Sequence, residues 1–272
     1  MLTTLPKEGL RAAIYSGDIY RFGATKWSTR LQNFVKNATK EHLGKNYRRT
    51  HETLSAQAFF ERIGGLRSLI YEAQYSKTCI EHIITSLGEE AIQFAYEPPK
   101  LRAVSHEGHR NPKAAPVYYG HRDTWYATPQ STINIWIPLD DLCEEETFAF
   151  YPSFFDQALL NNSNLFNFDN NALGAGWSSS SEGIENLFPT CSTLPNAHHE
   201  KTFSISENEI LVFSGSHFHR TKKQSLGTTR FSLDFRIVHL QDHAQNRGAP
   251  NVDNASQGCC LSSYRQPVSR AH

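Results

Sequence analysis

The fold of this chain is constrained most by a series of short strand-like segments that follow one another without long helices between them. These segments are aromatic or β-branched and are bounded by Pro, Gly or Asp, as is typical of β-strands. Parallel strands need long crossover connections, usually helices, so the pattern favours an antiparallel barrel or sandwich. The segments are AIQFAY (91–96), VYYGHRD (117–123), STINIWIPL (131–139), TFAFY (147–151), EILVFSG (209–215) and RFSLDFRIVHL (230–240).

The region before these strands, residues 1–95, is expected to combine a short opening strand with helices that are apolar on one side. Ser28 is expected to cap a first helix that Gly44 ends, and a second helix is expected from about Ser76 to Gly88. One-sided helices cover a sheet, so the predicted fold class is β-rich α+β with helices over the larger sheet. The apolar stripes comprise Leu31, Phe34, Val35 and Ala38 in the first helix and Ile80, Ile83, Ile84 and Leu87 in the second.

The length of 272 residues suits one β-rich domain with a substantial core. We expect residues 1–95 to cover the sheet, 96–240 to form the β core, and 241–272 to form an irregular tail that wraps the surface. Residues 157–200 interrupt the core with a segment rich in Asn, Ser and Gly. This segment is either a flexible surface insertion or a lid over a site at the mouth of the barrel.

The charge balance and the cysteines limit the partners and the compartment. Lys plus Arg and Asp plus Glu each number 27, so the formal net charge is zero. A neutral chain lacks the basic surplus that nucleic acids and anionic membranes attract, and no apolar run approaches the ~20 residues of a membrane span. The N-terminus lacks a signal-peptide pattern, and the five cysteines are scattered without a CxxC pair. We therefore expect reduced thiols, a cytoplasmic protein and a small-molecule partner.

A candidate for chemistry lies in the segment Tyr119-Gly120-His121-Arg122-Asp123. Residues i and i+2 of a strand point to one face, so His121 and Asp123 would present an imidazole and a carboxylate side by side. Taken alone, such a pair is more often an ordinary surface pair than part of a metal site.

Two later segments add to this pair. After the strand EILVF the chain turns at Gly215, and His217 and His219 follow at strand spacing. The last strand alternates strictly, with apolar residues on one face and Arg230, Ser232, Asp234 and Arg236 on the other. In a half-buried strand such a polar face ordinarily meets solvent.

The order and spacing of these elements resemble the Fe(II)/2-oxoglutarate-dependent dioxygenase superfamily, with its pattern H-x-D, then H, then R-x-S. The segments around them look most like the phytanoyl-CoA-hydroxylase-like branch. The resemblance implies a double-stranded β-helix, a cupin-like jelly roll. It also implies that His121, Asp123 and His219 bind Fe(II), with open positions for 2-oxoglutarate and O2. Arg230 and Ser232 would bind the distal carboxylate of 2-oxoglutarate, which gives the polar strand face a reason to point inward.

Two of these assignments have alternatives. His217 competes with His219 as the distal metal ligand, and we favour His219 because it lies eleven residues before Arg230, as is usual in the family. Arg236 competes with Arg230 for 2-oxoglutarate. We favour Arg230 because a serine follows at i+2, and we expect Arg236 to pair locally with Asp234.

Three further side chains are expected near the site. Asn134 lies on the strand that helps to hold 2-oxoglutarate in relatives and is predicted to contact it. Tyr126 and Trp136 are predicted to line the substrate pocket, with ordinary packing as the alternative.

The resemblance implies hydroxylation of an unactivated C–H bond of a small molecule, as in specialised metabolism, with succinate and CO2 as co-products. Halogenating relatives replace the carboxylate of H-x-D by Ala or Gly, so Asp123 favours hydroxylation or desaturation. The alternative is a cupin-like barrel that binds a small ligand without catalysis or holds Zn. Such a barrel does not need the Arg230-x-Ser232 element.

Overall fold

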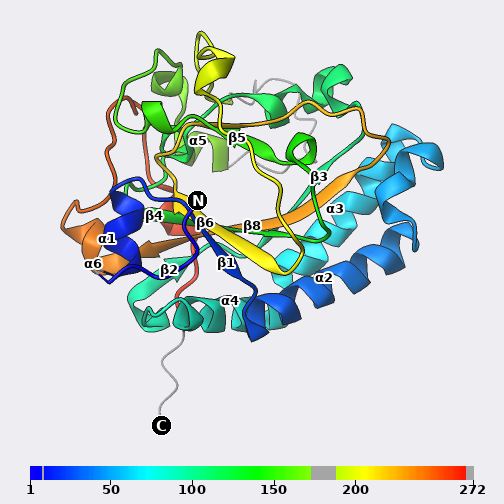
Figure 1. Ribbon diagram of the computed structural model, residues 1–272, viewed down its shortest axis with the longest axis horizontal. Coiled ribbons are helices and arrows are strands. Elements are labelled where there is room, and N and C mark those ends of the chain that lie inside the picture. The colour runs from blue at the N-terminus through cyan, green and yellow to red at the C-terminus, as the bar shows by residue number, and fades with distance from the viewer. Residues whose placement is uncertain (8, 173–187, 268–272) are drawn as a thin grey trace.

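The computed structural model describes residues 1–7, 9–172 and 188–267 and contains two antiparallel sheets. The larger sheet has the order β1-β6-β4-β8-β2, and β3 also pairs with β8 (Figure 1). The predicted antiparallel arrangement is therefore confirmed. Its strands are β1 (Tyr20–Gly23), β2 (Phe94–Tyr96), β3 (Lys100–Val104), β4 (Thr132–Pro138), β6 (Glu209–Ser214) and β8 (Arg230–His239), and the smaller sheet pairs β5 (Phe148–Phe150) with β7 (His219–Thr221).

Three long helices cover one face of the larger sheet, as the sequence predicts, and β5 lies on the other side (Figure 1). These helices are α2 (Lys26–Leu43), α3 (Ala56–Glu72) and α4 (Gln74–Ser86). The core between helices and sheet is made by apolar side chains that include Leu31, Ile63, Ile80, Ile133, Ile135, Phe231, Leu233 and Phe235. The short α-helices are α1 (Leu10–Tyr15), α5 (Phe168–Ala172) and α6 (Leu240–Ala244). Short 3-10 helices span Tyr47–Glu52, Ala91–Gln93, Gly108–Arg110, Pro112–Tyr118, Asp123–Tyr126, Glu144–Glu146, Pro152–Phe154, Ser163–Leu165, Ala197–His199 and Cys260–Ser263.

The helices correct one expectation and add one element that was not expected. Thr25, not Ser28, is the N-cap of α2, and Ser28 completes a reciprocal capping box three residues later. Helix α3 was not predicted from the sequence, because the Gly64-Gly65 pair lowers helix propensity in its middle. Tertiary packing of the buried Ile63 and Leu66 against the sheet outweighs that propensity.

The segment VYYGHRD is not a strand, contrary to the sequence-based prediction. Residues Pro112–Tyr118 form a 3-10 helix, and Pro116 within it lacks the N–H that a strand ladder needs. One isolated bridge, between His121 and His219, remains of the expected pairing. Arg122 is nevertheless extended, with φ −107° and ψ 147°, so His121 and Asp123 still point the same way.

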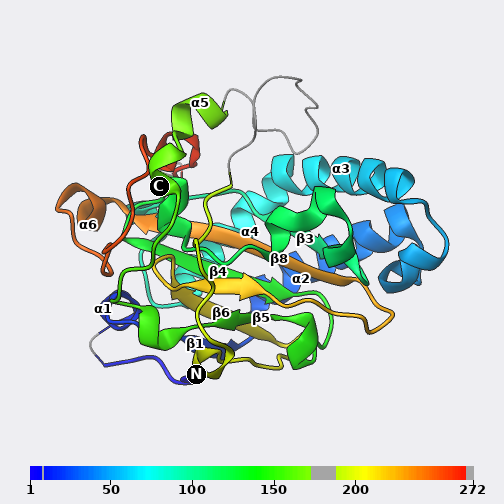
Figure 2. The same cartoon turned by 90° about the horizontal axis from the view of Figure 1, so that it is seen from above.

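The tail is partly built into the fold and does not simply wrap the surface as expected. Ala249, Cys260 and Tyr264 are buried, and α5 packs beside this C-terminal segment (Figure 2). The structure describes both ends of the predicted insertion (157–200), and an isolated β-bridge between Asn161 and Cys191 joins these two ends. Its central part, residues 173–187, on which the choice between surface loop and lid depends, lies outside the described residues.

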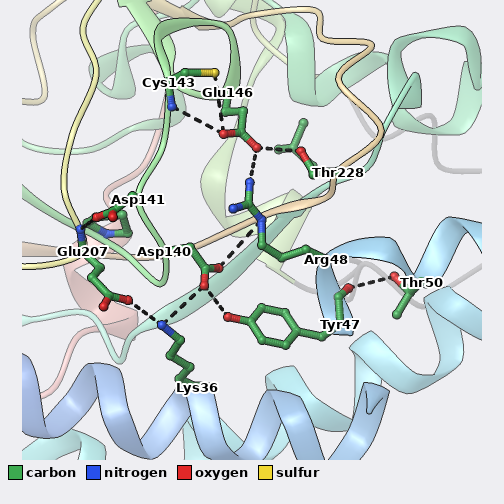
Figure 3. Close-up of polar contacts among 12 residues, drawn as sticks. Lys36, Tyr47, Arg48, Thr50, Asp140, Asp141, Cys143, Glu146, Glu207 and Thr228 are labelled. Atoms are coloured by element: carbon green, nitrogen blue, oxygen red, sulfur yellow. Dashed lines mark hydrogen bonds and ion pairs between the residues drawn. The ribbon is translucent and has the colours of Figure 1, made fainter. Parts of the chain in front are cut away.

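A polar network fixes the start of β8 to the helical layer (Figure 3). Arg48, which follows α2, pairs with Glu146, whose carboxylate also accepts a hydrogen bond from the Thr228 hydroxyl at 2.7 Å. The backbone N–H of Thr229 donates to the Arg48 carbonyl at 2.6 Å. These contacts hold the residues that immediately precede Arg230. Within the described residues, no helix is both long and apolar enough to cross a bilayer.

Candidate metal centre

His121, Asp123 and His219 converge at the edge where the two sheets meet. Their potential ligand atoms all lie within 4.8 Å of one another, as expected of groups that share one metal ion. The two histidines come together because their backbones form a reciprocal bridge, each N–H donating to the other carbonyl at 3.0 Å. Asp123 Oδ1 lies 3.7 Å from His121 Nε2. The structure thus assembles the three predicted ligands.

The hydrogen bonds of the two rings select the tautomer that binds metal. His121 Nδ1 lies 2.9 Å from the carbonyl of Tyr119, and His219 Nδ1 lies 2.9 Å from the carbonyl of His217. A carbonyl oxygen can only accept, so Nδ1 carries the hydrogen in each ring. The lone pair on each Nε2 is therefore free to bind a metal ion.

The ring environment also favours the neutral form. Burial lowers the pKa of His121 to about 4; the nearby His219 adds to this shift and Asp123 opposes it. Burial likewise lowers the pKa of His219. Both imidazoles are therefore uncharged at neutral pH, which is the protonation state that binds metal.

The Asp123 carboxylate is held on both of its oxygens. Arg236 Nη2 donates to Oδ1 at 2.9 Å, and Asn134 Nδ2 donates to Oδ2 at 2.5 Å. Burial would raise the pKa of Asp123, but the charge of Arg236 and its hydrogen bond outweigh that effect and hold the pKa well below its usual range. The carboxylate is thus ionised and fixed in orientation before any metal arrives.

The partner of Arg236 corrects the sequence-based prediction. Arg236 does not pair with Asp234; its second amino group donates to Glu97 at 2.8 Å, and Lys100 also pairs with Glu97. Asp234 pairs with Arg102, whose Nε and Nη2 lie 2.9 and 2.8 Å from Oδ2. The prediction failed because Glu97, directly after β2, and Arg102, on β3, lie beside β8, and the pairing of these strands with β8 was not expected from the sequence.

His217, the alternative ligand, points away from this group. Its ring is buried and packs against Phe155, Phe150 and Phe213, with centroids 4.5, 5.5 and 6.5 Å apart. Among the residues that the structure describes, neither ring nitrogen makes a well-formed hydrogen bond, although the Gly17 backbone lies close enough to oppose part of the pKa shift. Burial lowers the pKa of His217 to about 3. His217 contacts the metal group through its backbone carbonyl instead, which accepts the hydrogen bond from His219 Nδ1 and so orients the His219 ring.

Arg230 and Ser232 lie on the interior face of β8, opposite the helices, as the family resemblance implies and not toward solvent as is ordinary for such a strand. Both side chains are buried, at 3% and 0% exposure. Arg230 Nε and Nη1 and the Ser232 hydroxyl have no hydrogen-bond partner within the described ranges. Burial lowers the pKa of Arg230 to about 10, and its guanidinium lies 5.8 Å from the Trp136 ring centroid. A buried cation with unused donors fits an anionic ligand such as a carboxylate.

The other predicted contacts are placed as follows. Tyr126 packs edge-on against the His121 ring with centroids 5.3 Å apart, and its hydroxyl donates to the Pro189 carbonyl at 3.2 Å. Trp136 is buried against Phe148 and Phe203. Tyr126 therefore lies at the metal group, whereas Trp136 lies beside Arg230.

The metal group is closed on one side and accessible on the other. Phe148, Phe150 and Phe213 pack around His219, with ring centroids 5.6 to 6.2 Å away. On β8, by contrast, Asp234 keeps 21% of its side chain exposed, and its partner Arg102 keeps 30%. Within the metal group itself, His121 keeps 21% of its side chain exposed, whereas Asp123 keeps 3%.

Comparisons with known proteins identify solved structures that share this fold. No protein-family model and no curated protein matches this chain. EvdO2 from Micromonospora carbonacea var. aurantiaca is 10% identical, with a TM-score of 0.51 over 88% of this chain and 93% of that chain. EvdO2 complexed with 2-oxoglutarate is 11% identical, with a TM-score of 0.52 and the same coverage. The non-heme alpha ketoglutarate dependent carbocyclase SnoK from nogalamycin biosynthesis is 14% identical over 91% of this chain and 93% of that chain, with a TM-score of 0.42. At these identities, what this chain shares with EvdO2 is the fold.

Proposed function

We propose that this chain is a non-haem Fe(II)- and 2-oxoglutarate-dependent oxygenase that hydroxylates an unactivated C–H bond of a small molecule. The observation that carries the proposal is the pairing of two sites on one interior surface. Two neutral imidazoles and one carboxylate converge there, and a buried arginine with unused donors lies on the adjoining strand face. Two nitrogens and one oxygen suit Fe(II) and leave coordination positions open. The shared fold with EvdO2, solved with 2-oxoglutarate, supports these cofactors.

The fold and its branch are part of the same proposal. Two antiparallel sheets with helices on the larger one support a cupin-like double-stranded β-helix, and we place residues 1–272 in one such domain. The segments around the motifs, residues 121–139 and 213–236, favour the phytanoyl-CoA-hydroxylase-like branch.

The residues divide into two binding roles. His121, Asp123 and His219 would hold the iron through Nε2, a carboxylate oxygen and Nε2. Arg230 would bind the distal carboxylate of 2-oxoglutarate through its free guanidinium edge, and Ser232 would add a hydroxyl donor. When bound, iron and 2-oxoglutarate supply the oxidising chemistry with O2, and succinate and CO2 are released.

The surrounding side chains would prepare this site. Arg236 and Asn134 keep Asp123 ionised and oriented, and Asn134 also remains our candidate for a 2-oxoglutarate contact. The three phenylalanines around His219 exclude water from that side. The substrate would therefore approach from the accessible side, near Tyr126 and the Arg102–Asp234 pair, with Trp136 deeper inside.

The reaction outcome rests on Asp123. Its carboxylate would occupy the position that a halide needs, so oxygen insertion, or a related desaturation, is proposed over halogenation. A cupin-like barrel that binds Zn or a small ligand remains the alternative, but it gives no reason for a buried Arg230 with unused donors.

Succinate formation from 2-oxoglutarate tests the proposal. Metal-free protein is loaded with Fe(II) and incubated in air with 2-oxoglutarate and ascorbate, and succinate is quantified by mass spectrometry. We expect slow succinate release with Fe(II) and none with Zn(II). Succinate at the level of a protein-free control would favour the non-catalytic barrel.

A further inference from the structure

Arg122, between the two ligands His121 and Asp123, is a fully buried cation whose five N–H donors are all used. Its Nε pairs with Asp253 at 3.1 Å. Its amino groups donate to four backbone carbonyls, those of Ser216 at 2.5 Å, Phe154 at 2.6 Å, Gln157 at 2.8 Å and Phe155 at 3.3 Å. We call residues 121–123 the metal loop. The Arg122 side chain thus joins this loop to Ser216, which precedes His219, and to residues 154–157 at the start of the insertion.

Asp253 is the counter-charge of this cation and comes from the C-terminal segment. Its side chain is 4% exposed. Besides Arg122, Oδ2 accepts the backbone N–H of Leu159 at 2.9 Å, and Oδ1 accepts Trp125 Nε1 at 2.8 Å. Arg122 precedes Asp123 in the sequence and Trp125 follows it. The Asp253 carboxylate therefore binds the chain both before and after the candidate metal ligand Asp123.

We propose that Asp253 is a positioning residue of the metal group, acting through Arg122 and Trp125. This inference rests on the proposed function only in requiring that His121, Asp123 and His219 bind a divalent metal. The C-terminal segment then belongs to the metal site although it supplies no ligand.

The physical reason is the cost of a buried unpaired charge. Without the Asp253 charge, the buried Arg122 cation has no counter-charge, so its side chain is driven toward water and its bonds to the carbonyls weaken. Ser216 lies next to Gly215, whose carbonyl accepts the backbone N–H of Asp123 at 2.9 Å. The register between the two ligand-bearing segments therefore depends on the Arg122 contacts, and metal sites tolerate only small displacements of their ligands.

A matched pair of substitutions tests this role. Asp253→Asn removes the charge next to the metal loop. Asp242→Asn makes the same change at another buried carboxylate of the C-terminal region, which pairs with Arg11 at 2.5 Å and Arg247 at 3.0 Å and has no contact with the metal loop. A third variant, Trp125→Phe, removes one hydrogen bond to Asp253 and keeps an aromatic ring, so it remains informative if Asp253→Asn fails to fold.

Affinity for Co(II) is measured by calorimetry on metal-free protein, with the visible spectrum of the Co(II) complex as a second readout. We expect Asp253→Asn to weaken binding tenfold or more and alter the spectrum, Trp125→Phe to weaken it severalfold, and Asp242→Asn to change it less than twofold although its Tm falls. Unchanged binding in both Asp253→Asn and Trp125→Phe, or equal losses in the two Asn variants, would overturn the inference. Failure of the unaltered protein to bind Co(II) would instead overturn the proposed metal site.

Discussion

Asp123 and Arg236 form a buried ion pair in which Oδ1 and Nη2 are 2.9 Å apart. The second amino group of Arg236 binds Glu97, so one permanent positive charge lies between two carboxylates, one of which is a candidate metal ligand. The arrangement replaces part of the charge that a metal ion would supply. It explains why the metal-free protein can keep Asp123 ionised in its buried position.

The first prediction concerns this pair. Arg236→Gln leaves two buried carboxylates without their shared cation, so we expect the free energy of unfolding of the metal-free protein to fall by about 3–5 kcal/mol. A divalent metal then supplies the missing charge, so the rise in Tm on adding Co(II) should be larger than in the unaltered protein.

Chemical denaturation and thermal scans with and without Co(II) measure both effects. Arg49→Gln is the control, because Arg49 forms an exposed pair with Glu52 and its loss should cost less than about 0.5 kcal/mol. If Arg236→Gln has the same free energy of unfolding as the control, the ion pair does not stabilise the metal-free protein.

The second prediction separates the two candidate distal ligands. His121→Ala and His219→Ala should each abolish most Co(II) or Fe(II) binding, because the group has no ligand to spare. His217→Phe should keep it, since the carbonyl that orients His219 is retained and the ring lies among phenylalanines. Equilibrium dialysis of the three variants decides the question, and loss of metal in His217→Phe with full binding in His219→Ala would reverse the assignment.

The third prediction uses the Arg102–Asp234 pair beside the proposed 2-oxoglutarate site. Arg102→Gln leaves the Asp234 carboxylate unpaired and should weaken 2-oxoglutarate binding by charge repulsion. Asp234→Asn leaves Arg102 unpaired and should tighten it. Titration of 2-oxoglutarate into the Co(II)-loaded variants tests the opposite signs, and two shifts in the same direction would show that the pair does not face the co-substrate.

The fourth prediction concerns pH. Burial lowers the pKa of His121 to about 4 and that of His217 to about 3, against about 6.5 in an unfolded chain. The unfolded chain therefore takes up protons that the folded chain does not. The stability of the metal-free protein should be fully present above pH 6.5 and fall as the pH drops toward 4, by up to about 1.4 kcal/mol per pH unit for each such histidine.

Urea denaturation between pH 7.5 and 4.5 measures this slope. His217→Phe removes one of the buried histidines and should make the slope shallower. A stability that does not change over this range would contradict the neutral, buried state of these rings.

Local sequence patterns identified much of the sheet and of the site. The alternation in β8 predicted which side chains share a face, because a strand repeats every two residues, and the family resemblance implied that the polar face points inward. The resemblance carried by the H-x-D, H and R-x-S spacing predicted that His121, Asp123 and His219 share one site, and the three side chains converge although the segment around His121 is mostly 3-10 helix. The convergence needs no longer strand, because a single extended residue, Arg122, is enough to align His121 and Asp123.

The side chains that support the ligands could not be predicted in the same way. Glu97 and Arg102 depend on the pairing of β2 and β3 with β8, and KLRAV (100–104) is too short and too charged to predict as a strand. Asp253 lies 131 residues from Arg122 in a polar segment that resembles a surface tail. A buried ion pair between such distant positions has no local periodicity, so only the three-dimensional structure reveals it.

The most direct test of the central claim is an anaerobic titration of 2-oxoglutarate into the Fe(II)-loaded protein, followed by visible absorption. We expect a weak charge-transfer band that saturates with 2-oxoglutarate. In Arg230→Ala the same band should need a hundredfold or more 2-oxoglutarate, because a buried carboxylate loses a charged partner worth about 3–5 kcal/mol, while Fe(II) affinity stays close to that of the unaltered protein. A protein that binds Fe(II) but shows no band at any 2-oxoglutarate concentration would contradict the account.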